Sequence, residues 1–92
     1  MNKKSAKGVA GELLVMIKYI KKGFYVSRSS DPLYPFDVVV VDKYGVCRLI
    51  DVKSISIRKT GKQKGTKINR HANATQKKMK VSIEYVDTKT VI

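Results

Sequence analysis

Apolar residues recur along the chain with two different spacings, and each spacing predicts a different kind of element. Near the N-terminus they follow a helical period, in which positions three and four apart share one face. The pattern predicts a helix that is capped by Ser5 and ends near Lys22, just before Gly23. We expect its buried stripe to consist of Val9, Leu13, Met16, Ile17 and Ile20.

After this helix the apolar pattern becomes that of strands and turns. Residues 23–28 predict a short first strand, and residues 29–35, which contain both prolines of the chain, predict a loop. Four consecutive valines at residues 38–41 are typical of a buried strand, because β-branched side chains suit a sheet interior. A turn at residues 42–45 then leads into another strand, which we expect to continue to about Ile57.

The two strands around this turn predict a hairpin with acids at its open end. Asp37 and Asp51 each lie seven residues from Tyr44, the centre of the turn, and would therefore come close together. Asp51 and Lys53 are two residues apart, so they share one face of their strand. Val52 points to the opposite face, towards apolar packing.

The rest of the chain predicts a basic segment, a short helix and a last strand. Residues 58–70 contain six cationic residues and a single apolar one, which fits a solvated, mobile loop and equally a loop that closes over a phosphate backbone. Residues 72–79 suit a helix, and residues 81–86 alternate as a strand does. We therefore predict one α/β domain spanning residues 1–92, with the order αβββαβ and a mixed sheet flanked by helices.

The net charge of the chain indicates what kind of partner it binds. Twenty Lys and Arg residues against seven Asp and Glu residues give a net charge of +13. Such a field attracts polyanions, so nucleic acid is the first candidate partner. A membrane surface is the second, but there is no lipidation signal and no apolar run near the roughly 18 residues of a spanning helix. We expect no membrane partner.

The scarcity of cysteine and histidine excludes two classes of protein. One cysteine, Cys47, cannot form an internal disulfide, and with His71 as the only histidine a zinc finger is excluded. The N-terminus has no signal-peptide apolar core. The expected location is the cytoplasm of a bacterial, archaeal or phage-infected cell.

The acids and the lysine are suited to phosphodiester hydrolysis. Carboxylates are hard oxygen ligands for Mg²⁺ or Mn²⁺, which usually retain waters and bind a substrate phosphate. A bound ion polarises that phosphate and activates a water, while a lysine on the same face stabilises developing negative charge. An Asp-x-Lys sequence alone is common, and its usual explanation is a surface ion pair worth about 0–1 kcal/mol. Likewise, an isolated helical acid such as Glu12 is ordinarily just exposed.

The order in which the helical acid, the acid after the proline loop and the Asp-x-Lys sequence follow one another favours the catalytic interpretation. It resembles the PD-(D/E)XK nuclease superfamily, especially small archaeal-type Holliday junction resolvases and related phage or bacterial endonucleases. The resemblance covers residues 4–57 and rests on Lys7-Gly8 with Glu12, Gly23-Phe24-Tyr25-Val26 with Arg28, Pro35-Phe36-Asp37, and Ile50-Asp51-Val52-Lys53-Ser54. It continues through Thr75-Gln76 and residues 81–87. Two departures are the residue inserted between the proline and the first acid, and an Asp where Glu is commoner.

The resemblance implies a restriction-endonuclease-like fold and a role for each matching residue. Asp37 and Asp51 would bind Mg²⁺ or Mn²⁺, with the Val52 carbonyl and Glu12 adding ligands, and Lys53 would be the catalytic lysine. Arg28 would approach the DNA near the scissile phosphate, and Gln76 would border the site from its helix and contact the DNA. Further DNA contacts are expected from the basic residues of the N-terminus and the basic segment, namely Lys3, Lys4, Lys7, Lys62, Lys64, Lys67 and Arg70.

The predicted function is thus a metal-dependent DNA endonuclease, selective for branched or distorted DNA and acting as a homodimer, as the resembling resolvases do. The alternative is a non-catalytic nucleic-acid-binding module. A pure binder gains nothing from acids beside its cationic face, because they repel phosphate unless a cation intervenes. Its aromatic residues would also gather on a sheet face for base stacking, whereas here they are scattered.

Overall fold

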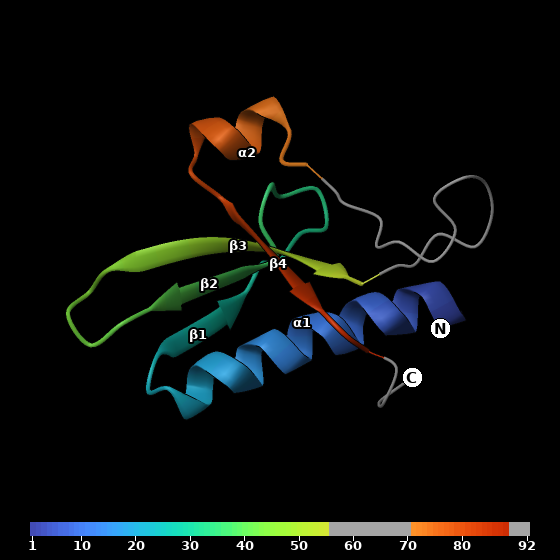
Figure 1. Ribbon diagram of the computed structural model, residues 1–92, viewed down its shortest axis with the longest axis horizontal. Coiled ribbons are helices and arrows are strands. Elements are labelled where there is room, and N and C mark those ends of the chain that lie inside the picture. The colour runs from blue at the N-terminus through green and yellow to red at the C-terminus, as the bar shows by residue number, and fades with distance from the viewer. Residues whose placement is uncertain (56–70, 89–92) are drawn as a thin grey trace.

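Four strands form a mixed sheet in the order β1-β2-β3-β4, with one long helix lying along it (Figure 1). The computed structural model describes residues 1–55 and 71–88. The elements are α1 (Lys3–Lys21), β1 (Tyr25–Arg28), β2 (Val38–Val41), β3 (Cys47–Ser54), α2 (Ala74–Lys78) and β4 (Ser82–Val86). This is the predicted order αβββαβ.

Helix α1 begins earlier than the sequence predicts, because Asn2 rather than Ser5 caps it. The Asn2 side chain accepts a hydrogen bond from the Ser5 backbone N–H at 2.8 Å. At the other end the chain turns at Gly23, whose φ of +88° is readily adopted only by glycine. The predicted end of the helix before Gly23 is confirmed.

The buried face of α1 differs from the predicted stripe. Gly11, Val15 and Tyr19, spaced four residues apart, face the sheet and are buried. In contrast Leu13, Ile17 and Ile20 are 45%, 49% and 57% exposed. The cause is close packing at Gly11, where an added Cβ would lie only 3.0 Å from a methyl carbon of Val86 on β4. The small residue brings the helix against the sheet and turns the larger apolar residues towards solvent.

The hairpin has the predicted register. In the antiparallel β2–β3 pair, Val38 lies opposite Ile50 and Val41 opposite Cys47, so the next position places Asp37 opposite Asp51. The Asp37 backbone is held on both sides, because its N–H donates to the Ile50 carbonyl and its carbonyl accepts from the Ser29 N–H, both at 2.8 Å. The expected continuation of the strand to Ile57 is not observed, since β3 ends at Ser54 and residues 56–57 lie outside the described part.

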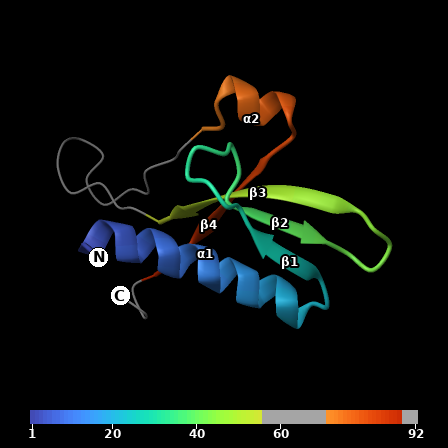
Figure 2. The ribbon, with the colours of Figure 1, turned by 180° about the vertical axis from the view of Figure 1, so that it is seen from behind.

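Strand β4 lies beside β3 and runs parallel to it, and α2 precedes β4 in the chain. Figure 2 shows from behind that α1 and α2 lie on opposite sides of the sheet. Helix α2 has a capping box, in which Asn73 and Gln76 each bond the backbone N–H of the other. Both α2 and β4 are shorter than their predicted ranges by one to three residues.

Alternation along β3 separates a packed face from a polar face. Ile50 and Val52 pack with Val15, Tyr19, Val38 and Val40 in the core beneath α1. Asp51 and Lys53 therefore point to the opposite face, as predicted. Within the described residues, no helix is sufficiently long and apolar to span a bilayer.

Candidate active site

The open end of the β2–β3 hairpin brings two carboxyl groups together. Asp51 is only 6% exposed, and Asp37 is half-buried beside it. The Val52 backbone N–H donates to Asp37 Oδ2 at 2.7 Å. The pKa of Asp37 is raised from 3.8 to about 6, mainly by burial and also by the neighbouring Asp51 and Glu12 carboxyl groups, while the Val52 hydrogen bond opposes the shift.

Asp51 has partners of two kinds. The Gln76 side-chain amide donates to Asp51 Oδ2 at 2.9 Å, and Lys53 Nζ lies 3.4 Å from the same oxygen. The Lys53 side chain is 37% exposed, so its ammonium group reaches solvent from a position next to the carboxylates. This is the same-face pairing that the two-residue spacing predicts.

Gln76 borders the site from its helix, as the resemblance implies, but it is buried, which does not favour the predicted DNA contact. It is 7% exposed, and its amide also donates to the Pro35 carbonyl at 2.8 Å. Its side-chain oxygen accepts from the Asn73 N–H at 3.0 Å. Since both ends of the amide are engaged inside the protein, Gln76 fixes α2 and the proline loop around Asp51.

Glu12 and Arg28 form an ion pair next to the carboxylate pair. Arg28 Nε donates to Glu12 Oε1 at 3.1 Å. Glu12 and Asp37 line a shared cavity of about 250 Å³, and Glu12 also lines a second cavity together with Lys53. Among the described residues, no three or more His, Cys, Asp or Glu side chains are grouped closely enough to hold a metal ion. Glu12 therefore adjoins the two aspartates without completing a three-acid cluster.

The Val52 backbone lies next to the Asp37 carboxyl group, to which its N–H donates. In a strand, the N–H and carbonyl of one residue point to the same side. Because the Val52 N–H reaches Asp37, its carbonyl points along the same side of β3, past the start of β2. Asp37, Asp51 and this carbonyl form the oxygen set nearest the hairpin opening.

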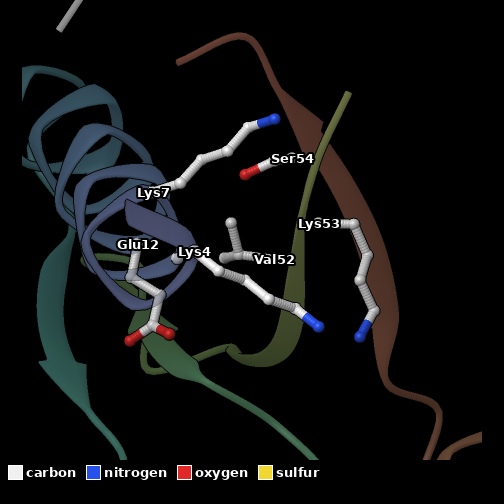
Figure 3. Close-up of a pocket in the computed structure, with 7 residues that line it drawn as sticks. Lys4, Lys7, Glu12, Val52, Lys53 and Ser54 are labelled. Carbon is white, nitrogen blue, oxygen red and sulfur yellow. The ribbon is translucent and has the colours of Figure 1, made fainter. Parts of the chain in front are cut away.

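The predicted basic residues divide into those that the structure locates and those that it does not. Lys4 and Lys7, on α1, line the second cavity, which has a volume of about 340 Å³ (Figure 3). Lys3 is exposed in the first turn of α1. The predicted contacts Lys62, Lys64, Lys67 and Arg70 lie outside the described residues.

Two lining residues of the second cavity, Gly8 and Ser54, were not singled out as site residues in their own right. The sequence contains a signal for each. Lys4, Gly8 and Gly11 follow one helical face that continues through Val15, and strand alternation places Ser54 on the face shared with Val52. The sequence analysis placed the buried face of α1 on its larger apolar residues and therefore missed this one.

Comparison with known proteins adds information on the fold. No family model matches the sequence, and no curated protein matches it. Among solved structures, the chain is similar to a bacterial homing endonuclease, I-Ssp6803I, with a TM-score of 0.58 and 23% sequence identity. The match covers 72% of this chain but only 42% of that protein, so the chain spans less than half of its length. The likeness confirms an α/β fold that is also found in a nuclease.

Proposed function

We propose that the chain is a divalent-metal-dependent DNA endonuclease of the PD-(D/E)XK type. The observation that carries the proposal is the meeting of Asp37 and Asp51 at the hairpin opening, with Lys53 Nζ 3.4 Å from Asp51. The net charge of +13 and the fold shared with a homing endonuclease support DNA as the substrate.

The residues at the hairpin opening fit Mg²⁺ or Mn²⁺. Two adjacent carboxyl groups, one with its pKa raised to about 6, repel each other when both are ionised, and a cation between them would offset that repulsion. Two carboxylates and the Val52 carbonyl match the few protein ligands that Mg²⁺ takes when water and phosphate oxygens complete its shell.

Each side chain has a distinct part in the proposed reaction. When bound, the ion polarises the scissile phosphate and lowers the pKa of the attacking water. Lys53 orients that water and stabilises the negative charge that develops on the phosphate. Gln76 keeps Asp51 in place through its 2.9 Å hydrogen bond, and Glu12 holds Arg28 beside the cavity that Asp37 lines.

We further propose selectivity for branched DNA and a homodimer. A symmetric dimer would place two active sites for paired cuts, as in the resolvases that the sequence resembles. Sedimentation velocity with and without a four-way junction tests the dimer directly, since a monomer in both conditions would contradict it.

Cleavage of a labelled panel tests the endonuclease. The panel holds a four-way junction, a flap, a linear duplex and a single strand, each with Mg²⁺, Mn²⁺ or EDTA. We expect metal-dependent cutting that is lost in Asp51→Asn but retained in Asp42→Asn, the matched change at the other end of the hairpin. Paired nicks confined to the junction would support the resolvase-like selectivity. Tight binding without cutting under any metal would favour the non-catalytic binding module.

A further inference from the structure

The second cavity lies between the start of α1 and the end of β3. Lys4, Lys7 and Gly8 line it from the helix, and Val52, Lys53 and Ser54 from the strand, with Glu12 completing the wall. Figure 3 shows the ammonium groups of Lys4 and Lys53 extending from these two elements at the opening, and Lys7 reaching towards Ser54. Its volume of about 340 Å³ has room for a phosphate group and part of its sugar.

The charges that line this cavity are not balanced. Three ammonium groups and one carboxylate, Glu12, line it. Glu12 already accepts from Arg28 at 3.1 Å, and Lys53 lies 3.4 Å from Asp51, which leaves Lys4 and Lys7. Within residues 1–55 and 71–88, neither Lys4 nor Lys7 forms an ion pair. An anion is the ligand that such a wall attracts, because cations without partners and a hydroxyl all bind phosphate oxygens.

The cavity is also joined to the proposed active site. Lys53 lines it and contacts Asp51, while Glu12 lines both this cavity and the one that contains Asp37. A phosphate held here would thus be a neighbour of one held at the carboxylates. In a nucleic acid strand, such neighbouring phosphates are separated by one nucleoside.

We propose that the cavity between α1 and β3 is a second phosphate site, which holds the phosphate next to the scissile one in the same strand. The inference rests on the proposed function for what occupies the neighbouring site. Lys4 and Lys7 bind the second phosphate, and Lys53 lies between the two. Gly8 keeps the helical wall open, since a Cβ built there meets nothing within 4 Å and any longer side chain has open space to fill.

Thymidine 3′,5′-bisphosphate carries two phosphates on one nucleoside, as neighbouring phosphates of a strand do. Its binding can be measured without cleavage, and it can occupy the two sites without sliding along a longer strand. Its affinity is measured by calorimetry beside that of thymidine 5′-monophosphate, with Mg²⁺ and with EDTA. We expect the double variant Lys4→Gln, Lys7→Gln to bind the bisphosphate at least about tenfold less tightly, because it removes both lysine contacts to the second phosphate. The matched control, Lys21→Gln with Lys22→Gln, removes the same charge from the far end of α1 and should bind as the wild type does.

Gly8→Leu tests the cavity without changing charge. The substitution improves helix propensity and fills the open space, so we expect the preference for the bisphosphate to disappear, whereas Gly8→Ala should retain it. Equal losses in the two lysine pairs, or an unchanged preference in Gly8→Leu, would overturn the second site. If bisphosphate binding changes in the variants as expected but no DNA of the labelled panel is cut, the proposed endonuclease activity is wrong and the proposed phosphate site is supported. If the DNA is cut but bisphosphate binding does not change in the variants as expected, only the proposed phosphate site is wrong.

Discussion

The two ends of the β2–β3 hairpin both carry aspartate, but the side chains are used differently. At the closed end, Asp42 Oδ1 accepts hydrogen bonds from the backbone N–H groups of Tyr44 and Val46, at 2.8 and 3.0 Å. At the open end, the Asp37 side chain accepts the Val52 N–H and lies next to the Asp51 carboxyl group. The Asp42 carboxylate is thus hydrogen-bonded within the turn, whereas the Asp37 and Asp51 carboxyl groups lie next to each other.

This difference separates a structural acid from a candidate functional one. The Asp42 hydrogen bonds explain the turn completely, because an aspartate that bonds the backbone two residues on stabilises such turns. At the open end two carboxyl groups lie side by side, and burial together with the neighbouring acids raises the pKa of Asp37 to about 6. Groups arranged at a cost to stability are typical of functional sites.

The largest expected contrast between the two ends is catalytic. Lys53→Ala should lower the cleavage rate roughly a hundredfold or more, because it removes a charge beside the developing negative charge. Lys43→Ala, the matched change in the turn, should cleave as the wild type does. Single-turnover rates and DNA affinity are measured for both variants. Cleavage by Lys53→Ala at the wild-type rate would show that another group stabilises the transition state.

The next effect concerns the buried support of the open end. Gln76→Leu leaves Asp51 Oδ2, the Pro35 carbonyl and the Asn73 N–H without their present partner. We expect the free energy of unfolding to fall by about 2–3 kcal/mol, the penalty for buried groups left unpaired. Urea denaturation measures it, with the exposed neighbour change Lys77→Leu as control. Equal stabilities for the two variants would remove Gln76 from its supporting role.

A smaller loss is expected at the closed end. Asp42→Ala removes two exposed hydrogen bonds to the turn, so the free energy of unfolding should fall by about 1–2 kcal/mol. Its cleavage rate, measured below the unfolding transition, should equal that of the wild type. A reduced rate in the folded variant would mean that the two ends are coupled and that the contrast between them is incomplete.

The open end could be predicted from the sequence because its cause is local. A β-branched run, a turn and the strand period of two determine the register that brings Asp37 opposite Asp51, and they place Lys53 beside Asp51. The order of elements and the mixed sheet follow from the same signals. The hairpin depends on residues close together in the chain, whereas the parallel pairing of β3 with β4 joins distant segments.

The parts that the sequence did not reveal depend on contacts between distant segments. The bond from Gln76 to Asp51 joins residues 25 positions apart, and no periodicity reports it. Similarly, the ion pair between Glu12 and Arg28 joins α1 to β1. The buried face of α1 was mispredicted because apolar size favoured Leu13 and Ile17, whereas close packing at Gly11 decided the orientation.

A further expected effect is a pH dependence that arises from Asp37. Its pKa is raised from 3.8 in the unfolded chain to about 6 in the fold, so between these values the folded state binds more protons. The free energy of unfolding should therefore fall as pH rises from about 4 to about 6, and this contribution should be constant above that window. Asp37→Asn removes the titrating group, so the difference in stability between wild type and variant should grow through the same window in favour of the variant.

Denaturant titrations at intervals from pH 4 to pH 8, first in EDTA, measure this difference. Adding Mg²⁺ should reverse it for the wild type, because the ion binds ionised carboxylates and its stabilising effect increases as Asp37 loses its proton. Asp37→Asn should gain little from Mg²⁺ at any pH. Parallel stability curves for the two proteins in EDTA would mean that Asp37 does not make stability depend on pH. The two ends of the hairpin would then differ only in their hydrogen bonds. Diverging curves in EDTA that converge or cross with Mg²⁺ would identify the open end as a place where a proton and a metal ion compete for the same carboxylate.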